Sequence, residues 1–258
     1  MKKLIFLSLL IVNISFAQSN EKFLMDFLLE DKLKPDNVLS NYNQFDYTNL
    51  WSQTKNHKVL GIIGSDHQRI KVKLISIKKD STNPNKYLVS GKSIVKGTIC
   101  DFTGIITLEE IKEVEKLHFG VDNKYQNKGI KSQGILIANY EFKENKNQKH
   151  SGIFKGQFYS KWYLSSEDQI EYDKIQSIAD GYSNNAFIGI WKSYKTGKKK
   201  ICNWADYRVP KANQDFDVGA GEFSPSKKYH EKGWENYQKA WLYGNQQAKN
   251  VELKEWWK

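Results

Sequence analysis

Apolar and polar residues alternate along most of the chain between residues 58 and 210, in short runs separated by polar turns. The clearest case is residues 152–164, where Phe154, Phe158 and Trp162 share one face while the other face carries lysine and glutamine. A period of two residues is typical of a β-strand with one face buried and the other in water. The pattern therefore predicts a mainly β domain over residues 58–210.

Eight segments of this domain have strand character: 59–63, 69–77, 87–96, 98–108, 130–142, 152–164, 186–194 and 199–209. A shorter stretch at 169–172 has it as well. Most turns between them are too short for crossover helices, so consecutive strands are expected to pair antiparallel. Because closure removes exposed sheet edges, an antiparallel meander of this number favours a closed or nearly closed eight-stranded barrel. A two-sheet β-sandwich is the alternative.

One predicted strand carries a change of phase. Ile70, Val72 and Leu74 alternate with polar residues, but Ile75 and Ile77 take the opposite phase, which predicts a bulge or a strong bend. Glycines also recur inside the predicted strands, at Gly61, Gly91, Gly104, Gly134, Gly156 and Gly189. Interior glycines weaken a flat strand, but they permit the sharp bends that a small barrel needs.

Helical spacing appears only in the flanking segments. Phe23 and Phe27 share one side of a predicted helix over 20–31, and Trp234 and Trp241 recur at helical spacing near the C-terminus. The predicted division is a signal peptide at 1–17, a helical arm and linker at 18–57, the β-barrel domain at 58–210, and a C-terminal irregular and helical extension packed on the barrel at 211–258. The strand count is similar to that of the lipocalin- and avidin-like (calycin) barrels as an architecture, and no family membership follows from it.

The first residues predict export. Lys2 and Lys3 precede an apolar run over 4–16, and Ser15 and Ala17 are small residues placed for cleavage after Ala17. The apolar run is too short to span a bilayer and no second one follows it, so no transmembrane segment is expected in the mature chain. The mature protein is therefore expected in the periplasm, outside the cell or at the cell surface.

The charge favours anionic partners. Without Lys2 and Lys3 the 40 basic residues become 38, against 29 acidic residues, and the net charge is +9. A small apolar or anionic envelope ligand fits this balance. The lysines are spread along the chain, with Lys198–Lys200 the longest run, so a lysine-rich soluble surface is the competing interpretation. Nucleic acid is not an expected partner, because the chain has no known nucleic-acid-binding motif and is predicted to be exported. The oligomeric state stays open.

No cofactor, metal site or catalytic residue is predicted. The five histidines are scattered without metal-ligand spacing, and no phosphate-binding loop or nucleophile motif is complete. Cys100 and Cys202 lack the spacing of a zinc or redox site. In an oxidising compartment they form either one long-range disulfide or two buried thiols that act as small apolar side chains.

The strongest candidate site is the predicted hairpin over 184–210. Its second strand places Trp204, Asp206 and Arg208 on one face, with Trp191 on the facing strand and Tyr194 at the turn. Aromatic rings beside cationic side chains suit a sugar ring, an anionic headgroup or a base. The competing interpretation is a buried tryptophan with a surface ion pair between Asp206 and Arg208.

These features favour a secreted or periplasmic β-barrel protein that is more a non-enzymatic ligand-binding or envelope-associated module than an enzyme. One alternative is an envelope-acting hydrolase that uses paired carboxylates near Asp206 and Glu222. The other is a structural or interaction protein whose terminal aromatic residues, Trp256 and Trp257, dock a partner. The barrel-binding hypothesis predicts an apolar cavity of several hundred cubic ångströms that opens beside the hairpin.

Overall fold

The computed structural model describes residues 23–24, 27–28, 32–217 and 223–258 of the 258-residue chain. The predicted signal peptide at 1–17 and most of the helix predicted over 20–31 lie outside the described residues. The four residues of that segment that are described, 23–24 and 27–28, are helical, and Phe23 and Phe27 are buried.

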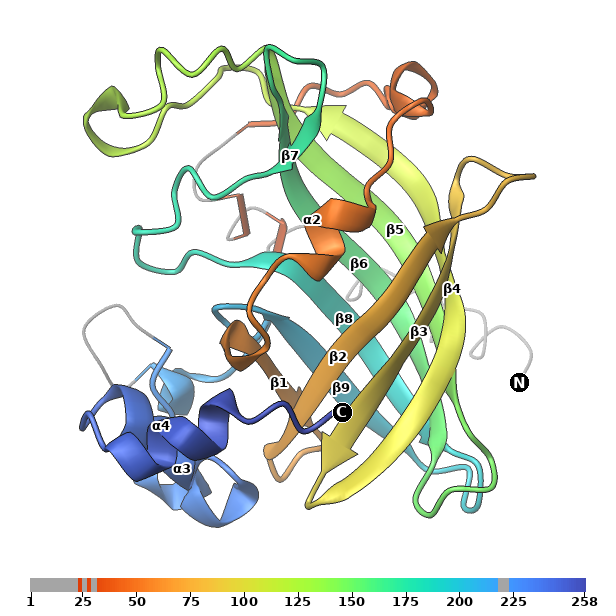
Figure 1. The fold of residues 1–258 in the computed structure, drawn as a ribbon, viewed down its shortest axis with the longest axis vertical. Helices are drawn as coiled ribbons and strands as arrows, with labels where there is room; N and C mark the ends of the chain where they lie inside the picture. Colours follow the sequence, from red (N-terminus) through yellow and green to blue (C-terminus); the bar gives the residue numbers. More distant parts are fainter. Residues whose placement is uncertain (1–22, 25–26, 29–31, 218–222) are drawn as a thin grey trace, which may run out of the picture.

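Eight antiparallel strands close into a barrel (Figure 1). They are β1 (Val59–Ile63), β2 (Gln68–Lys79), β3 (Lys86–Val95), β4 (Thr98–Glu113), β5 (Ser132–Glu144), β6 (Gly152–Leu164), β8 (Asn184–Ser193) and β9 (Lys199–Asp206). Each strand pairs with the next along this order, and β9 pairs with β1 to complete the ring. The closed meander barrel is confirmed and replaces the sandwich alternative. A ninth strand, β7 (Ile170–Tyr172), adds to β6 alone, where the short extra stretch was predicted.

The predicted change of phase in β2 is a β-bulge. The register of β2 against β3 shifts between Leu74 and Ser76. A second bulge shifts the register of β4 against β5 between Leu108 and Glu110. The strand therefore continues to Glu113, although its alternation breaks at Leu108 and the sequence predicted its end there. The charged residues beyond Leu108 belong to the barrel wall, because the bulge resets which side chains face the interior.

Glycine is required where β6 and β8 approach each other. Gly156 and Gly189 are directly paired across these two strands. A Cβ atom on Gly156 would lie 2.0 Å from the carbonyl oxygen of Ile188 and 2.6 Å from the Cα of Gly189. No side chain fits in this space, so the interior glycines bring the two backbones together and let the wall bend.

Aromatic side chains fill the barrel interior, and the N-terminal arm plugs one end. The core includes Tyr87, Phe102, Tyr140, Phe142, Phe154, Phe158, Trp162, Phe187 and Trp204. The arm contains a 3₁₀ helix at Leu39–Tyr42, α2 (Thr48–Ser52), and a 3₁₀ helix at Asn56–Lys58. The Trp51 ring of α2 lies 4.8 Å from the Tyr87 ring and 5.3 Å from the Phe158 ring, measured between centroids. This packing closes the upper end of the barrel in Figure 1.

The C-terminal segment packs against the outside of β2. It contains 3₁₀ helices at Gln214–Phe216 and Lys227–Lys232, followed by α3 (Glu235–Trp241) and α4 (Gln246–Leu253). Arg69 of β2 donates two hydrogen bonds of 2.8 and 2.6 Å to the buried carboxylate of Glu252. Its guanidinium also lies 4.9 Å from the ring of Trp234. Another 3₁₀ turn lies at Val121–Asn123, and none of the helices described is both long and apolar enough to cross a bilayer.

The two cysteines are free, so the disulfide interpretation is wrong for this structure. Cys100 and Cys202 are both buried thiols, and they lie on β4 and β9, which stand on opposite walls of the ring. With strands spaced about 4.8 Å apart, an eight-stranded ring is at least about 12 Å across. A disulfide needs Cα atoms within about 7 Å. The alternative of two buried thiols describes the structure.

Candidate functional site

The end of the barrel opposite α2 is an open mouth. Four turns meet there, after β1, β3, β5 and β8, at the lower end of the barrel in Figure 1. The mouth contains a cavity of about 430 Å³, lined by residues from all eight barrel strands. Its volume falls in the range of small-molecule sites. It opens beside the β8–β9 hairpin, where the binding hypothesis placed a cavity.

A buried carboxylate anchors this mouth. Glu144, the last residue of β5, is 4% exposed and points inward with Tyr140 and Phe142. One carboxylate oxygen accepts a hydrogen bond of 2.5 Å from the Ser93 hydroxyl. The other accepts 2.8 Å hydrogen bonds from the Gly152 amide and the Trp191 indole. Burial raises the pKa of Glu144, although these three hydrogen bonds act in the opposite direction. The carboxyl group thus ties four strands together.

The Trp191 ring forms one wall of the cavity because of this arrangement. The indole N–H bonded to Glu144 fixes the ring orientation. The ring also lies against Gly152, where a Cβ atom would come within 2.6 Å of the indole Cε2 atom. Trp191 is therefore held between a carboxylate and a backbone position that accepts only glycine.

The rest of the cavity combines an apolar floor with a cationic rim. Ile63, Val95 and Phe154 line its inner part, whereas Lys96 and Lys200 stand at the edge with exposed side chains. Neither lysine has an ion pair with any residue that the structure describes. Asp66 and Glu144 line the cavity as well, but Asp66 is ion-paired with Lys232 at 3.5 Å and Glu144 is held by three protein donors. The two lysines therefore remain to face an anionic group above the apolar surface.

Trp191 and Tyr194 belong to the mouth region, as two members of the predicted site. Tyr194 follows β8 in the turn, where the ammonium group of Lys146 lies 5.3 Å from its ring centroid. Trp204 does not join them, because its side chain is 2% exposed in the barrel core. There it stacks on Phe187 with a centroid distance of 4.6 Å.

Asp206 lies near the opposite, plugged end of the barrel. One of its carboxylate oxygens accepts hydrogen bonds from Thr54, Tyr172 and Asn185, at 2.8, 2.9 and 2.8 Å. Burial raises the pKa of Asp206 to about 7, against the effect of these hydrogen bonds. The cavity beside it measures about 30 Å³, which is room for about one water molecule.

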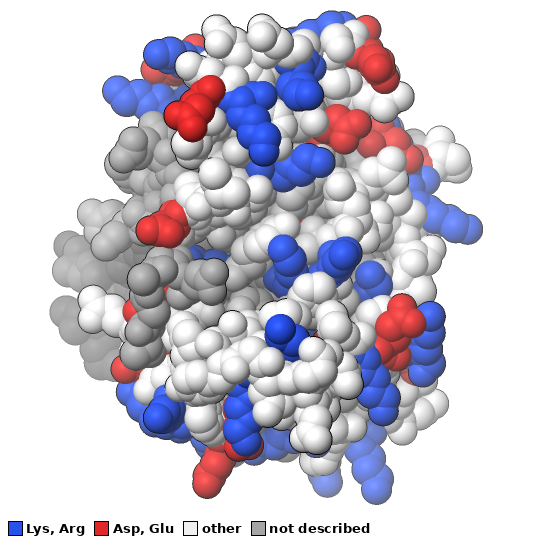
Figure 2. Space-filling model, turned by 60° about the vertical axis from the view of Figure 1, so that its left-hand side comes forward, with Lys and Arg blue, Asp and Glu red and all other residues white. Residues whose placement is uncertain are grey.

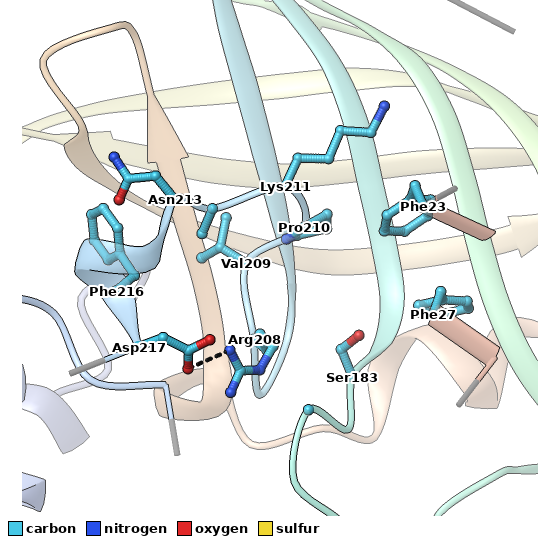
Figure 3. A pocket seen from close by; sticks show the side chains of 12 residues that line it. Phe23, Phe27, Ser183, Arg208, Val209, Pro210, Lys211, Asn213, Phe216 and Asp217 are labelled. Atoms are coloured by element: carbon cyan, nitrogen blue, oxygen red, sulfur yellow. Dashed lines mark hydrogen bonds and ion pairs between the residues drawn. The ribbon is translucent and has the colours of Figure 1, made fainter. Parts of the chain in front are cut away.

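Arg208 lies outside the barrel, and its guanidinium forms a 2.7 Å ion pair with Asp217 (Figure 3). The alternation that placed Arg208 beside Trp204 and Asp206 ends with β9 at Asp206. In Figure 3, Arg208 and Val209 border a cavity of about 380 Å³ that has Phe23 and Phe27 on its other side. The predicted residues therefore lie in four surroundings: the mouth, the core, the plugged end and the outer surface.

The residues of the two alternative hypotheses have other surroundings. Asp206 is buried among hydrogen-bond donors, and Glu222 lies outside the described residues. Trp256 donates a hydrogen bond of 2.9 Å to Asn56, and the ammonium group of Lys73 lies 5.3 Å from the ring of Trp257. The terminal aromatic residues are thus docked on their own barrel.

Sequence reasoning missed Glu144, the residue that organises the mouth. A signal for it was present, because Glu144 continues the inward phase of Tyr140 and Phe142. An acid in the phase of an apolar face is a candidate for a buried carboxylate. The strand predicted over 130–142 ends two residues before Glu144, so the prediction leaves this residue outside the barrel.

Charge on the surface is dispersed. On the face shown in Figure 2, lysine and arginine side chains are distributed over the whole length of the molecule, and acidic side chains lie between them. Several basic side chains border a hollow across the middle of this face. Within the described ranges, no group of three or more histidine, cysteine, aspartate or glutamate side chains is placed to hold a metal ion.

Fold and site together define the class: an eight-stranded antiparallel β-barrel plugged at one end and hollow at the other. No family model, curated protein or solved structure matches this chain. The function is therefore argued from the site alone.

Proposed function

We propose that the protein is a non-enzymatic binding module that takes a small amphipathic anion into the barrel mouth. One observation carries the proposal: a cavity of about 430 Å³ has Ile63, Val95 and Phe154 inside it and Lys96 and Lys200 at its edge. The export expected from residues 1–17 makes an envelope or extracellular molecule the natural ligand.

The apolar part of the ligand lies against Phe154 and the indole of Trp191, where burial contributes about 25 cal/mol per Å² of apolar surface. Its anionic group faces Lys96 and Lys200. Glu144 is a positioning residue, because three protein donors already occupy its carboxylate oxygens. Its hydrogen bond keeps the indole wall in place before a ligand enters, which lowers the ordering cost of binding.

The test is calorimetric titration of the mature chain with laurate, an anion with an apolar tail. Removing both rim charges, with Lys96→Gln and Lys200→Gln together, is expected to weaken binding about tenfold, since each exposed charge pair contributes about 0.5–1 kcal/mol. Val95→Trp adds an indole ring to the inner part of the cavity and is expected to weaken laurate binding by more than about tenfold. Lys192→Gln is the matched control, because Lys192 is exposed and does not line the cavity.

Dodecyltrimethylammonium, which has a tail of the same length and the opposite charge, separates charge from apolar burial. It is expected to bind wild type more weakly than laurate and to be indifferent to the rim substitutions. Laurate binding with an affinity that Val95→Trp leaves unchanged would place the ligand elsewhere and refute the proposal. Equal affinity for the two surfactants would refute its anionic part.

A further inference from the structure

A larger cavity, which we call the outer groove, lies outside the barrel. It measures about 620 Å³ and lies between the β6–β8 connection and the C-terminal helices. In Figure 1 these two segments face each other on the left side of the barrel. Its wall includes His57, Lys58, Asp180, Tyr207, Arg208 and Trp241. Strand β9 connects the two sites: Lys200, near its first residue, lines the mouth, and Tyr207 follows its last residue and lines the outer groove. The outer groove and the mouth are therefore separate sites at opposite ends of β9.

A strained turn forms part of this wall. Tyr207 has a φ of 70°, and the amide of Arg208 donates a 2.9 Å hydrogen bond to the carbonyl of Asp206. A three-residue turn with positive φ at its centre is a rare and strained γ-turn, more so with a bulky side chain at that position. A 2.7 Å hydrogen bond from the Tyr207 amide to the carbonyl of Lys58 helps to hold it. Strain of this kind is retained where the surrounding structure over-determines it, and it concentrates at ligand sites.

Aromatic rings and cations alternate around the outer groove. The ammonium group of Lys58 lies 4.8 Å from the ring centroid of Tyr207, and Lys58 has no ion pair with any described residue. The ring of His57 stacks on Trp241 at 5.2 Å with an interplanar angle of 26°, and Trp241 keeps 37% of its surface exposed. Arg208, whose guanidinium is already ion-paired with Asp217, supplies a second cation at this wall, and Asp180 supplies a hydrogen-bond acceptor.

We propose that the outer groove binds an acidic sugar, a pyranose unit that carries a carboxylate or sulfate group. The exposed part of the Trp241 ring and the half-buried ring of Tyr207 suit a sugar ring, and Lys58 and Arg208 suit its anionic group. Asp180 accepts hydrogen bonds from sugar hydroxyl groups. A lipid tail cannot form hydrogen bonds or ion pairs with the polar side chains beside these rings, so a sugar fits the outer groove better than a hydrocarbon chain does. The proposal rests on none of the mouth residues.

The experiment titrates the mature chain with tetragalacturonate and with a chondroitin sulfate tetrasaccharide, followed by calorimetry and by the ring resonances of His57. Maltotetraose is the uncharged control, galacturonate monomer separates a free sugar from a chain, and ATP tests a nucleotide. One or both acidic tetramers are expected to bind. Tyr207→Asn, which keeps a residue that tolerates positive φ, and Trp241→Ala are each expected to weaken binding about tenfold or more.

Lys58→Gln is expected to weaken binding about fivefold. Tyr243→Ala is the matched control, because Tyr243 is 58% exposed and does not line the outer groove. Burial lowers the pKa of His57, Lys58 and Lys55 lower it further, and Glu252 opposes them. An anion bound in the outer groove adds negative charge beside the ring, so the pKa of His57 is expected to rise on binding.

Three results would overturn the proposal. The first is no binding of either acidic tetramer at millimolar concentration. The second is binding that is unaffected by Tyr207→Asn and Trp241→Ala, which would place the sugar elsewhere. The third is maltotetraose or ATP binding as tightly as the acidic tetramers with the same sensitivity to these substitutions. Laurate binding at the mouth decides none of these outcomes, so the two sites succeed or fail separately.

Discussion

Replacing Asp206 by asparagine is expected to stabilise the protein in a pH-dependent manner. The carboxyl group is buried, and one of its oxygens accepts hydrogen bonds from Thr54, Tyr172 and Asn185. The carbonyl oxygen of an asparagine side chain has two lone pairs and can accept two of these three bonds, and the bond that is lost changes the free energy of unfolding equally at every pH. Asp206→Asn therefore removes the charge with little change in shape, and the two proteins differ mainly in the cost of burying a charge.

The size of the effect follows from the pKa of Asp206, which burial raises from 3.8 to about 7. Between these values the folded state holds a proton that the unfolded state has lost, so the stability of the wild type falls as the pH rises. Below the lower value both states are protonated and the charge costs nothing. Above the higher value the whole difference applies, which at 1.36 kcal/mol per pH unit amounts to about 4 kcal/mol.

Urea unfolding of both proteins between pH 4 and pH 8.5 measures this difference. The free energy of unfolding of Asp206→Asn minus that of wild type is expected to grow by about 4 kcal/mol across the range, with most of the rise between about pH 4 and pH 7 and a plateau above. Because Glu144 is present in both proteins, its contribution to the pH dependence cancels in this difference of unfolding free energies. Asp36→Asn, which removes an exposed carboxylate that has no hydrogen bond or ion pair with a described residue, is the control for the loss of a surface charge. A flat difference for Asp206→Asn would refute the burial argument.

Three further predictions test the packing. Glu252→Gln leaves the buried guanidinium of Arg69 without its ionic partner and is expected to cost about 3–5 kcal/mol in urea unfolding at pH 7. Burial raises the pKa of Glu252, but Arg69 and Lys71 together lower it below its ordinary value, so the loss is expected to disappear in acid, where the wild-type carboxyl is protonated as well. Gly156→Ala is expected to prevent folding or lower the melting temperature by more than about 10 °C, whereas a small change measured by circular dichroism would contradict the close strand approach. Reduction is expected to leave the mass unchanged, and Cys202, which is fully buried and lines no mouth cavity, is expected to react with a maleimide only after unfolding; modification of Cys202 in the folded chain would contradict its burial.

The barrel could be predicted because its information is local and periodic. Alternation placed all eight strands, and the phase change at Ile75 located the bulge in β2. The end of β4 was placed too early, because the bulge after Leu108 breaks the same alternation that identifies a strand. A bulge inside a long strand and the end of a strand leave similar marks in a sequence, and only pairing with a neighbour separates them.

The site could be predicted only in part, because it depends on which strand ends meet. The face of Trp204, Asp206 and Arg208 was inferred by extending the alternation of β9 past Asp206, where the structure instead makes a γ-turn. Trp191 and Glu144 are 47 positions apart in sequence, and barrel closure joins them by a hydrogen bond. No local pattern encodes that contact. An inward acid at the end of an apolar face was the available signal.

The two ends of the barrel are filled differently, so ligand binding at the open mouth and the charge of Asp206 near the plugged end are expected to affect stability independently. The arm carries Trp51 into one end, whereas the inward residues at the other end include Glu144 and Ser93, which leave space above Phe154. A ligand that binds only the folded mouth, at 100 times its dissociation constant, adds about 2.7 kcal/mol to the free energy of unfolding. That increment is expected to be the same in wild type and Asp206→Asn, because distant and independent effects add. A ligand increment that depends on the substitution would show that the two ends are coupled.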